Sequence, residues 1–365
     1  MKLRESVSAS GLWLSAETPD IRGGGGQRRQ YFQLQAIRAA LGDVDVLTLA
    51  SGQDTSSMVE IGRFSTFRAP RLRGTWRDPV IRRALGQRLP TVVAHAESLG
   101  LVHHGLKQAK PPYLVDFQNV LSRYFAATGD ADAAERWRRR ERAILQTACA
   151  AVAVSHAEAA TLRALQPDAI VMVAENGVDP SEWGEHDARR PDSAVVAFFG
   201  SLEHVSNAQG LDWFLYDVWP RIVRAVPRAE FHIFGPGRPP DIALSSQGVR
   251  VRGRVADLSQ ALSTACMLVV PVVSGMGARV KFVEGLASGL PVVSTTLGAE
   301  GYERAEGYVL ANGPGDFADA CVDMIRDPDA ATEMGLAGRQ SALRHYTWDQ
   351  TTRPIIDWLT LNGGP

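Results

Sequence analysis

Residues 272–301, VVSGMGARVKFVEGLASGLPVVSTTLGAEG, decide the fold that this sequence predicts. The run that leads into them, 268–273, is apolar and mostly β-branched, which is typical of a buried parallel strand. A glycine-containing turn follows, and then helical periodicity over 278–287 that a glycine and a proline end. A second apolar run, 290–295, comes next. Strand, glycine turn, helix and strand make a parallel βαβ unit, whose turn presents backbone N–H groups at the beginning of a helix.

Two cations stand at the beginning of that helix, where the helix dipole disfavours positive charge. We therefore expect Arg279 and Lys281 to be neutralised by an anion, and we interpret them as a clamp for a diphosphate. Glu284, one turn further on, can accept hydrogen bonds from two neighbouring hydroxyl groups. A diphosphate beside a diol describes a nucleotide sugar. The same spacing also fits an exposed helix with an i,i+3 Lys/Glu pair, and the residues alone leave both interpretations open.

The composition is that of a globular protein long enough for two domains, with 365 residues of which 45% are hydrophobic and 22% charged. A formal net charge of −1 gives no general attraction for nucleic acid. Residues 61–90 carry eight arginines and one acid, a patch that fits an anionic acceptor, an acidic membrane surface or an ordinary solvated face. No apolar run of ~18–20 residues and no signal segment is visible, so we expect a cytoplasmic protein, at most peripheral to a membrane.

The three cysteines, Cys149, Cys266 and Cys321, stand in apolar or helical surroundings without close pairing. We expect them to be buried thiols in a reducing compartment. No group of residues has the spacing of metal ligands. We therefore expect no metal and no cofactor, the nucleotide sugar being a substrate.

Short apolar strands alternate with amphipathic helices through both halves of the chain, which predicts an α/β protein with two Rossmann-like domains. We expect strands at 10–15, 45–49, 91–96, 113–117, 151–154, 170–173, 194–199, 230–234, 249–255, 268–273 and 290–295. We expect helices at 28–41, 133–148, 156–165, 210–226, 257–264, 278–287, 316–326, 330–346 and 348–361. The polar residues 181–193 are expected to be the linker between the domains.

Polar residues and glycines follow several of the expected strands. The four glycines at 23–26 follow the first strand, His95 and Glu97 end the third, and Asp116 and Asn119 end the fourth. Open α/β sheets bind ligands at the carboxyl ends of their strands, so these residues are candidates for a site. Each also fits a helix cap or a hydrogen-bonded polar group.

Several segments together resemble the family 4 retaining glycosyltransferases. They are Asn176-Gly177-Val178-Asp179, Phe199-Gly200-Ser201, the stretch GARVKFVEGLASGLPVV at 277–293, LGAEG at 297–301, and Tyr346-Thr347-Trp348-Asp349. The resemblance covers nearly the whole chain and is strongest over 195–301. It implies the GT-B fold, two Rossmann-like domains facing across a cleft. The implied division is an acceptor domain at 1–185, a donor domain at 194–345, and a C-terminal helix, 346–365, that crosses back to the first domain.

The resemblance implies metal-independent transfer of a sugar, with retention, from a nucleotide-diphosphate sugar to a hydroxyl of a small-molecule, glycan or lipid-linked acceptor. The implied donor contacts are Gly24, Gly25, Ser201, Val255, Gly275, Met276, Gly277, Arg279, Lys281 and Glu284, with Glu284 on the ribose hydroxyls. The expected catalytic residues are Arg279, Lys281 and Glu97. The acceptor is expected to pass His95, Glu97, His103, Asp116 and Asn119.

The sequence departs from the family pattern at the donor site. Met276 stands where the family has the first of two spaced glutamates, and the usual arginine and lysine of the second domain fall near Ser201 and near Asn207 or Ala208. The diphosphate clamp is therefore expected at Arg279 and Lys281, and the identity of the sugar stays open. Two rival functions also stay open: a sugar-nucleotide epimerase of the same fold and a non-catalytic nucleotide-sugar-binding module.

Overall fold

The computed structural model of the chain describes residues 10–48, 84–96, 105–184, 194–275 and 277–363. The chain divides into two compact units. Unit 1 comprises Met1–Glu175 and Trp348–Pro365, and unit 2 comprises Asn176–Thr347. Each unit is described by itself below.

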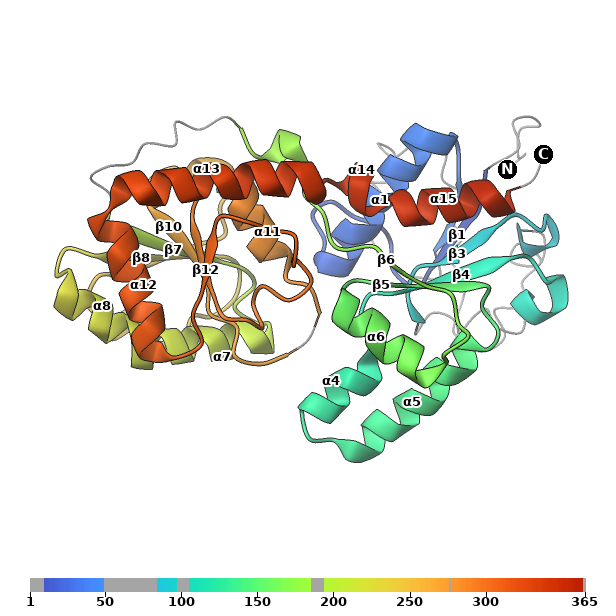
Figure 1. Cartoon of the computed structure of the whole chain (residues 1–365), viewed down its shortest axis with the longest axis horizontal. Helices are drawn as coiled ribbons and strands as arrows, with labels where there is room; N and C mark the ends of the chain where they lie inside the picture. Colours follow the sequence, from blue (N-terminus) through green and yellow to red (C-terminus); the bar gives the residue numbers. More distant parts are fainter. Residues whose placement is uncertain (1–9, 49–83, 97–104, 185–193, 276, 364–365) are drawn as a thin grey trace. The chain divides into compact units, whose positions relative to one another are not determined.

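Unit 1 is built on a parallel sheet with the strand order β2-β1-β3-β4-β5-β6 among its described residues (Figure 1). The strands are β1 Leu12–Ser15, β2 Asp45–Thr48, β3 Thr91–Val93, β4 Tyr113–Phe117, β5 Ala150–Ala153 and β6 Val171–Val173. Five of the six lie within the runs predicted from the sequence, and β5 begins one residue before its predicted run of 151–154. Strands such as β4 are buried along their whole length, as expected for a parallel sheet covered on both faces.

Helices cover both faces of the unit 1 sheet. They are α1 Gly25–Leu41, α4 Leu121–Ala127, α5 Ala131–Leu145, α6 His156–Leu165, α14 Trp348–Thr351 and α15 Arg353–Asn362. One apolar core joins α1, α14 and α15 to the sheet, where Phe32 stacks on Trp348 with ring centroids 5.4 Å apart. The core of the other face packs residues of α5 and α6, such as Leu145 and Leu162, against the sheet. The C-terminal segment thus completes unit 1, and Figure 1 shows α15 beside α1.

Unit 2 repeats the plan with the strand order β12-β11-β10-β7-β8-β9, again all parallel. The strands are β7 Val195–Phe199, β8 Glu230–Phe234, β9 Val249–Gly253, β10 Met267–Val270, β11 Val292–Ser294 and β12 Tyr308–Leu310. The helices are α7 Val205–Trp213, η5 Phe214–Val218, α8 Trp219–Ala225, α9 Asp241–Ser245, α10 Leu258–Leu262, α11 Val280–Ala287, α12 Pro314–Arg326 and α13 Pro328–His345, preceded by the 3₁₀ turn η4 Pro180–Glu182.

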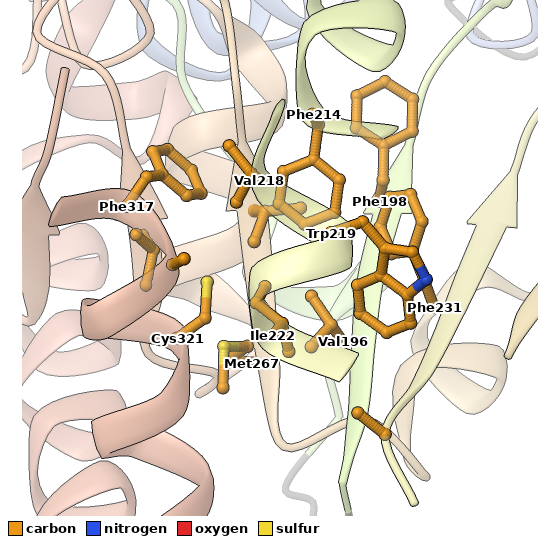
Figure 2. Packing of buried hydrophobic residues seen from close by; sticks show 14 of the residues in the cluster. Val196, Phe198, Phe214, Val218, Trp219, Ile222, Phe231, Met267, Phe317 and Cys321 are labelled. Carbon is orange, nitrogen blue, oxygen red and sulfur yellow. The ribbon is translucent and has the colours of Figure 1, made fainter. Parts of the chain in front are cut away.

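Two apolar cores hold unit 2 together, one on each face of its sheet. Figure 2 shows the first, in which aromatic residues of η5 and α8, Phe214 and Trp219, meet Phe231 of β8 and Phe317 of α12. The second core joins α11 and α13 to the opposite face, and Phe282 is fully buried there. Because both faces are covered, ligands reach this sheet at the ends of its strands.

The strand order locates the ligand-binding edge in each unit. In unit 2 the chain moves from β7 toward one side of the sheet and from β10 toward the other, so β7 and β10 flank a topological switch point. In unit 1 the corresponding reversal lies between β1 and β3. Open α/β sheets bind ligands outside the carboxyl ends of the strands at such points. The segments that follow β1, β3, β7 and β10 are therefore the places to look for a site.

The helix after β7 begins earlier than the sequence predicts. We expected one helix over 210–226, whereas α7 begins at Val205 and continues through the π-helical η5 into α8. Residues 205–209, VSNAQ, lack apolar periodicity because Ser206, Asn207 and Gln209 are polar. The early beginning places Ser206 and Asn207 in the first turn of α7.

The expected linker over 181–193 is wrong at its beginning. Trp183 is buried in the second core of unit 2, and its carbonyl oxygen accepts a hydrogen bond of 2.8 Å from Arg339 of α13. Val178, further upstream, forms an isolated bridge with Thr347. These contacts make 176–184 part of unit 2, so its boundary lies at Glu175/Asn176 rather than at 185. Residues 185–193 lie outside the described residues.

Three short elements were not predicted: α4, α9 and β12. The helices α4 and α9 have seven and five residues, which is too short for a periodic apolar pattern to stand out. The strand β12 has only three residues, of which none is buried, and so short an apolar run does not distinguish a strand from a loop. Their positions follow from tertiary packing rather than from local pattern.

Gly210 sets the distance between α7 and the end of β10. A Cβ atom at this position would lie 3.1 Å from the carbonyl carbon of Pro271 and overlap the carbonyl oxygen. Only glycine lets the helix approach the strand end so closely. The approach brings the first turn of α7 to the segment that follows β10, Ser274–Gly277 in the sequence.

We predict that Gly210→Ala destabilises the protein by about 1–3 kcal/mol, because the helix must move away from Pro271. Gly315→Ala in α12 is the matched control, since a Cβ there meets nothing within 4 Å. The control should be neutral or stabilising by up to about 1 kcal/mol through its effect on the unfolded chain. Calorimetric melting of both variants checks the prediction, and equal transition temperatures would contradict it.

Candidate functional site

The side chain of Lys281 lies at the switch point of unit 2 with its ammonium group enclosed. Nζ donates a hydrogen bond of 2.6 Å to Oδ1 of Asn207 in α7. The same atom lies 4.2 Å from the ring centroid of Phe198 in β7, a cation–π contact. Gly200, with φ +147°, leaves room for it, since a Cβ there would lie 2.7 Å from Nζ. The predicted lysine therefore points inward at the strand ends.

Asn207 is held in one orientation by two hydrogen bonds. Its Nδ2 donates to the carbonyl oxygen of Ser201 at 2.7 Å, while its Oδ1 accepts from Lys281. The amide thus joins the loop after β7 to the helix after β10. The family pattern has a lysine near Asn207 or Ala208, and here the ammonium group of Lys281 reaches Asn207 from the other helix.

Enclosure changes the proton affinity of Lys281. The pKa of its ammonium group is lowered from 10.5 to about 7, mainly by burial and then by the charge of Arg279, while the carboxylate of Glu284 partly opposes both. The charge interactions also show that all three side chains lie close together. An anion bound here would restore the proton affinity of Lys281 by compensating its buried charge.

Arg279 is the N-cap residue of α11, rather than part of its first turn as we expected. Its Nη2 donates to the carbonyl oxygen of Ser274 at 3.3 Å. A Cβ at Gly275 would lie 2.7 Å from that Nη2 and 3.0 Å from Oγ of Ser206. Ser274 also donates a side-chain hydrogen bond to Gln209 of α7. The beginnings of α7 and α11 therefore meet around the glycine turn, which brings two sets of helix-terminal N–H groups together.

His204 is the N-cap residue of α7 and completes the cationic group. Its Nδ1 lies 2.9 Å from Oγ of Ser206. Partial burial, and then the charges of Arg279 and Lys281, lower the pKa of its imidazole below 6.5. The sequence analysis did not single out His204, because the polar run 203–209 gave no sign that a helix begins inside it.

The structure brings most of the predicted donor contacts of unit 2 to this place. Glu284, half-buried, lies on the same side of α11 as Lys281, as its effect on the lysine shows. Ser201 takes part through its carbonyl oxygen. Val255 follows β9, which is separated from β10 by β7 and β8 in the sheet. Its side chain packs against the second core. Met276 lies outside the described residues.

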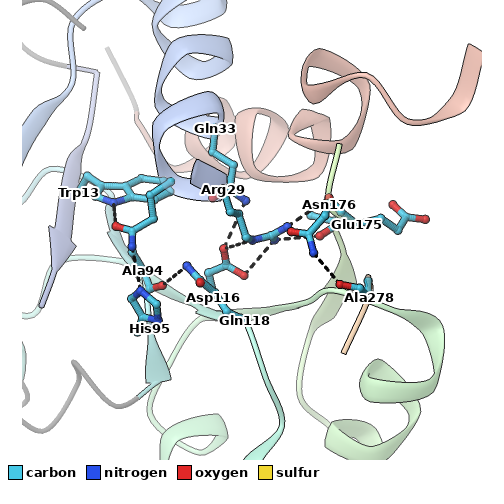
Figure 3. A network of polar contacts seen from close by, with 12 residues as sticks. Trp13, Arg29, Gln33, Ala94, His95, Asp116, Gln118, Glu175, Asn176 and Ala278 are labelled. Carbon is cyan, nitrogen blue, oxygen red and sulfur yellow. Dashed lines mark hydrogen bonds and ion pairs between the residues drawn. The ribbon is translucent and has the colours of Figure 1, made fainter. Parts of the chain in front are cut away.

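The family-like segment that begins at Asn176 contacts the residues just before α11 directly. Nδ2 of Asn176 donates to the carbonyl oxygen of Ala278 at 3.2 Å, as Figure 3 shows. Ala278 immediately precedes Arg279. The contact thus helps to fix the backbone from which the cations of α11 project.

A second group of predicted residues lies at the switch point of unit 1. Gly24 is the N-cap of α1, and Gly25 begins the helix, so the glycine run forms a helix beginning rather than the free loop that we expected before residue 28. His95, after β3, has Nε2 2.8 Å from Nε2 of Gln30 and 3.8 Å from a carboxylate oxygen of Glu17. Its imidazole Cε1 would lie 3.4 Å from a Cβ at Gly26. His95, expected on the acceptor side, and the glycines at the beginning of α1, of which Gly24 and Gly25 are expected to contact the donor, are therefore neighbours within unit 1.

Asp116 does not line that site, and this expectation was wrong. Its side chain is fully buried and accepts hydrogen bonds from Nε and Nη2 of Arg29 at 3.0 and 3.1 Å (Figure 3). The guanidinium also donates to the carbonyl oxygens of Ala174 and Glu175. Arg29, which lies close to the glycines at the beginning of α1, thus points inward and is paired with Asp116. The pair joins α1, β4 and the end of β6.

The remaining expectations have mixed outcomes. Asn119 is exposed just after β4. Cys266 and Cys321 are buried thiols as predicted, whereas Cys149 is exposed, because it lies just before β5 at the surface end of a turn. Glu97, His103 and most of the arginine-rich segment 61–90 lie outside the described residues.

The described residues contain neither a helix that could span a membrane nor a cluster of candidate metal ligands. No helix among them is both long and apolar enough to cross a membrane. No group of three or more His, Cys, Asp or Glu side chains in the described ranges is arranged to hold a metal ion.

Comparison with known families identifies the class. The model described as Glycosyltransferase Family 4 matches residues 23–182, and the model described as Glycosyl transferases group 1 matches residues 193–327. Between them the two models match most of both units. The chain belongs to the family 4 glycosyltransferases, and its two Rossmann-like domains are those of the GT-B fold.

Solved structures share this fold at low sequence identity. The sucrose-phosphate synthase of Thermosynechococcus elongatus has a TM-score of 0.73 and 18% identity, with 96% of this chain and 98% of that chain covered. The Anabaena protein Alr3699/HepE in complex with UDP has a TM-score of 0.72 and 14% identity, with 96% of this chain and 100% of that chain covered.

A curated relative is the GDP-mannose-dependent monoacylated alpha-(1-6)-phosphatidylinositol monomannoside mannosyltransferase of Corynebacterium glutamicum. It is 27% identical over 153 residues, which cover 37% of this chain and 40% of the relative. The chain spans about two fifths of the length of the curated relatives that it matches.

We predict that Asp116→Asn destabilises unit 1 by about 3–5 kcal/mol, because it leaves the buried guanidinium of Arg29 unpaired. For a unit of this size the melting temperature should fall by roughly 6–20 °C. The double variant Arg29→Met/Asp116→Leu should recover much of the loss, since two apolar residues replace both charges. Calorimetry of the single and double variants measures both effects. An unchanged melting temperature in Asp116→Asn would contradict the structural role of the ion pair and make Asp116 a candidate ligand-binding residue again.

Proposed function

We propose that this protein transfers a sugar from a nucleotide-diphosphate sugar to a hydroxyl group of an acceptor. The transfer retains the anomeric configuration and needs no metal ion. Unit 2 binds the donor at its switch point. Unit 1 supplies backbone contacts to the diphosphate from Gly24 and Gly25, and receives the acceptor near His95.

The observation that carries the proposal is the group of cationic side chains around the glycine turn of unit 2. Lys281 and Arg279 lie close enough for each charge to influence the other, and the pKa of Lys281 falls to about 7 as a result of burial and of this proximity. Like charges gathered without an anion weaken a fold. The beginnings of α7 and α11 add N–H groups that favour the same ligand. A diphosphate satisfies all of these groups together.

The chemistry required of such a site is stabilisation of a leaving group. As the bond between the anomeric carbon and the phosphate oxygen breaks, negative charge grows on the diphosphate and positive charge grows on the sugar. Arg279 and Lys281 are placed to hold the diphosphate, and their attraction strengthens as its charge grows. The acceptor oxygen bonds to the anomeric carbon on the same face, and its proton passes to the leaving phosphate oxygen. Glu284 binds the ribose hydroxyls and holds the nucleotide in place.

Relatives guide the choice of ligands to test. One similar structure is described in complex with UDP, and one curated relative is described as dependent on GDP-mannose and active on a phosphatidylinositol monomannoside. UDP- and GDP-sugars are therefore the first donors to test, and glycan and lipid-linked hydroxyl compounds are the first acceptors.

Thermal stabilisation by nucleotide sugars tests the donor site. A true ligand at 100 times its dissociation constant should stabilise the protein by about 2.7 kcal/mol. The stabilising donor is then incubated with candidate acceptors, and released nucleoside diphosphate and the anomeric configuration of the product are measured. Stabilisation without transfer to any acceptor would favour a binding module, and conversion of the donor sugar without an acceptor would favour an epimerase.

We predict that Lys281→Met, which keeps the apolar stem against Phe198, weakens binding of the nucleoside diphosphate by about 1.5–3 kcal/mol, or roughly 10- to 150-fold. Turnover should fall further, by about 2–4 kcal/mol of transition-state stabilisation, because the lost charge faces the leaving group. Lys107→Ala, on the exposed surface of unit 1, is the control and should leave both quantities unchanged. Native turnover in Lys281→Met would exclude the proposed role.

We predict that affinity for the nucleoside diphosphate falls as the pH rises above 7, approaching tenfold per pH unit. The folded-state pKa of Lys281, about 7, lies below its ordinary 10.5, so the ammonium group is half charged near pH 7, gains the rest of its charge as the pH falls and loses it as the pH rises. The terminal phosphate of the ligand is already ionised in this range. Titration calorimetry between pH 7 and 9 measures the effect.

The variant Lys281→Arg provides the control for this pH dependence, because its guanidinium stays charged throughout. Its affinity should be nearly constant over the same range. A flat pH profile in the native protein would show that Lys281 does not bind the diphosphate.

A further inference from the structure

We propose that His204 is a third cationic ligand of the donor diphosphate, and that its imidazole takes up a proton when the donor binds. The inference rests on the proposed function and deepens it. His204 lies in the sequence between Ser201 and Asn207, the two positions near which the family pattern has an arginine and a lysine.

The position of His204 carries the inference. It is the last residue before α7, so its side chain stands at the beginning of the helix that meets the glycine turn. Its Nδ1 lies 2.9 Å from Oγ of Ser206, and that Oγ in turn lies beside Gly275, where Nη2 of Arg279 also lies. The imidazole and the guanidinium therefore border the same turn. With Nδ1 turned to Ser206, Nε2 is the nitrogen left to contact a ligand.

The charges around His204 explain why it is neutral before the donor binds. Arg279 and Lys281, both from the α11 side, lower the pKa of the imidazole, in addition to the effect of its partial burial. Glu284 lies one turn beyond Lys281 and acts mainly on that lysine. Glu203, the neighbour of His204, lies against Gly237, with Cγ 2.8 Å from a Cβ built there. The two charged groups that lower the pKa of the imidazole, Arg279 and Lys281, are thus both positive.

A bound diphosphate reverses this balance. It carries at least two negative charges at neutral pH, and it neutralises Arg279 and Lys281 while attracting a proton to the imidazole. A protonated His204 then donates a charge-assisted hydrogen bond to a phosphate oxygen. The chain has neither an arginine at Ser201 nor a lysine at Asn207, so a third cation from His204 restores the charge that the usual pattern supplies from the same loop.

The test compares native protein with His204→Gln, which keeps a polar side chain and cannot become charged. Titration calorimetry with UDP, or with GDP if the native protein prefers it, is performed from pH 6.5 to 8.5. The dissociation constant of His204→Gln should exceed the native value about tenfold at pH 6.5 and should approach it at pH 8.5. His156→Gln, on the exposed surface of unit 1, is the matched control and should bind like the native protein at every pH.

A structural role for His204 would give a different result. If the imidazole only held the loop through Ser206, the ratio of the two dissociation constants would be the same at every pH, and this outcome would overturn the proposal. The imidazole Cε1–H resonance supplies a second measurement, with His204→Gln used for assignment. Its titration midpoint should move upward by at least one pH unit when UDP or GDP is bound, and an unmoved midpoint would also overturn the proposal.

Failure of the proposed function is distinguishable from failure of this inference. If neither UDP nor GDP binds the native protein, the donor site itself is wrong. If one of them binds, and Lys281→Met weakens it while His204→Gln does not, the donor site stands and His204 has no part in it.

Discussion

The proposed donor site of unit 2 depends on one enclosed ammonium group. Lys281 is attached to α11, yet its Nζ is held by Asn207 of α7 and by the ring of Phe198 in β7. The lysine therefore joins the two helices that flank the switch point. Because its charge is enclosed beside that of Arg279, an anion bound there would compensate both charges. Stability and ligand binding thus meet in the same side chain.

The two units place polar groups at equivalent edges but use them differently. In unit 1 the ion pair between Arg29 and Asp116 is buried, and it holds α1 to the sheet. In unit 2 the cations stand at the beginnings of helices and face a turn. A paired charge inside a core fixes geometry, whereas neighbouring like charges at a strand end indicate a ligand. The same sheet plan therefore supports an anchor in one unit and a binding site in the other.

The sequence predicted the inner strands and α11 well, because a buried parallel strand and a short amphipathic helix leave local patterns. It also predicted that Arg279, Lys281 and Glu284 would gather, since they occupy neighbouring turns of one helix. The partners of these residues were not predictable in the same way. Asn207 and His204 lie more than 70 residues from Lys281, and only the sheet order brings them together. The errors at Asp116 and Trp183 have the same origin. Asp116, a polar residue at a strand end, pairs with Arg29, and Trp183, an apolar residue in a polar segment, contacts Arg339. Both partners are distant in the sequence.

The space that Gly200 leaves for Lys281 has an evolutionary consequence. Any larger residue at 200 collides with the ammonium group, and any residue at 207 without a carbonyl oxygen removes its acceptor. Substitutions at these three positions should therefore be strongly non-additive. A lysine carried by α7 makes one on α11 redundant, and the reverse holds equally. We therefore expect residues 200, 207 and 281 to vary together within this family, with one lysine carried either by α7 or by α11.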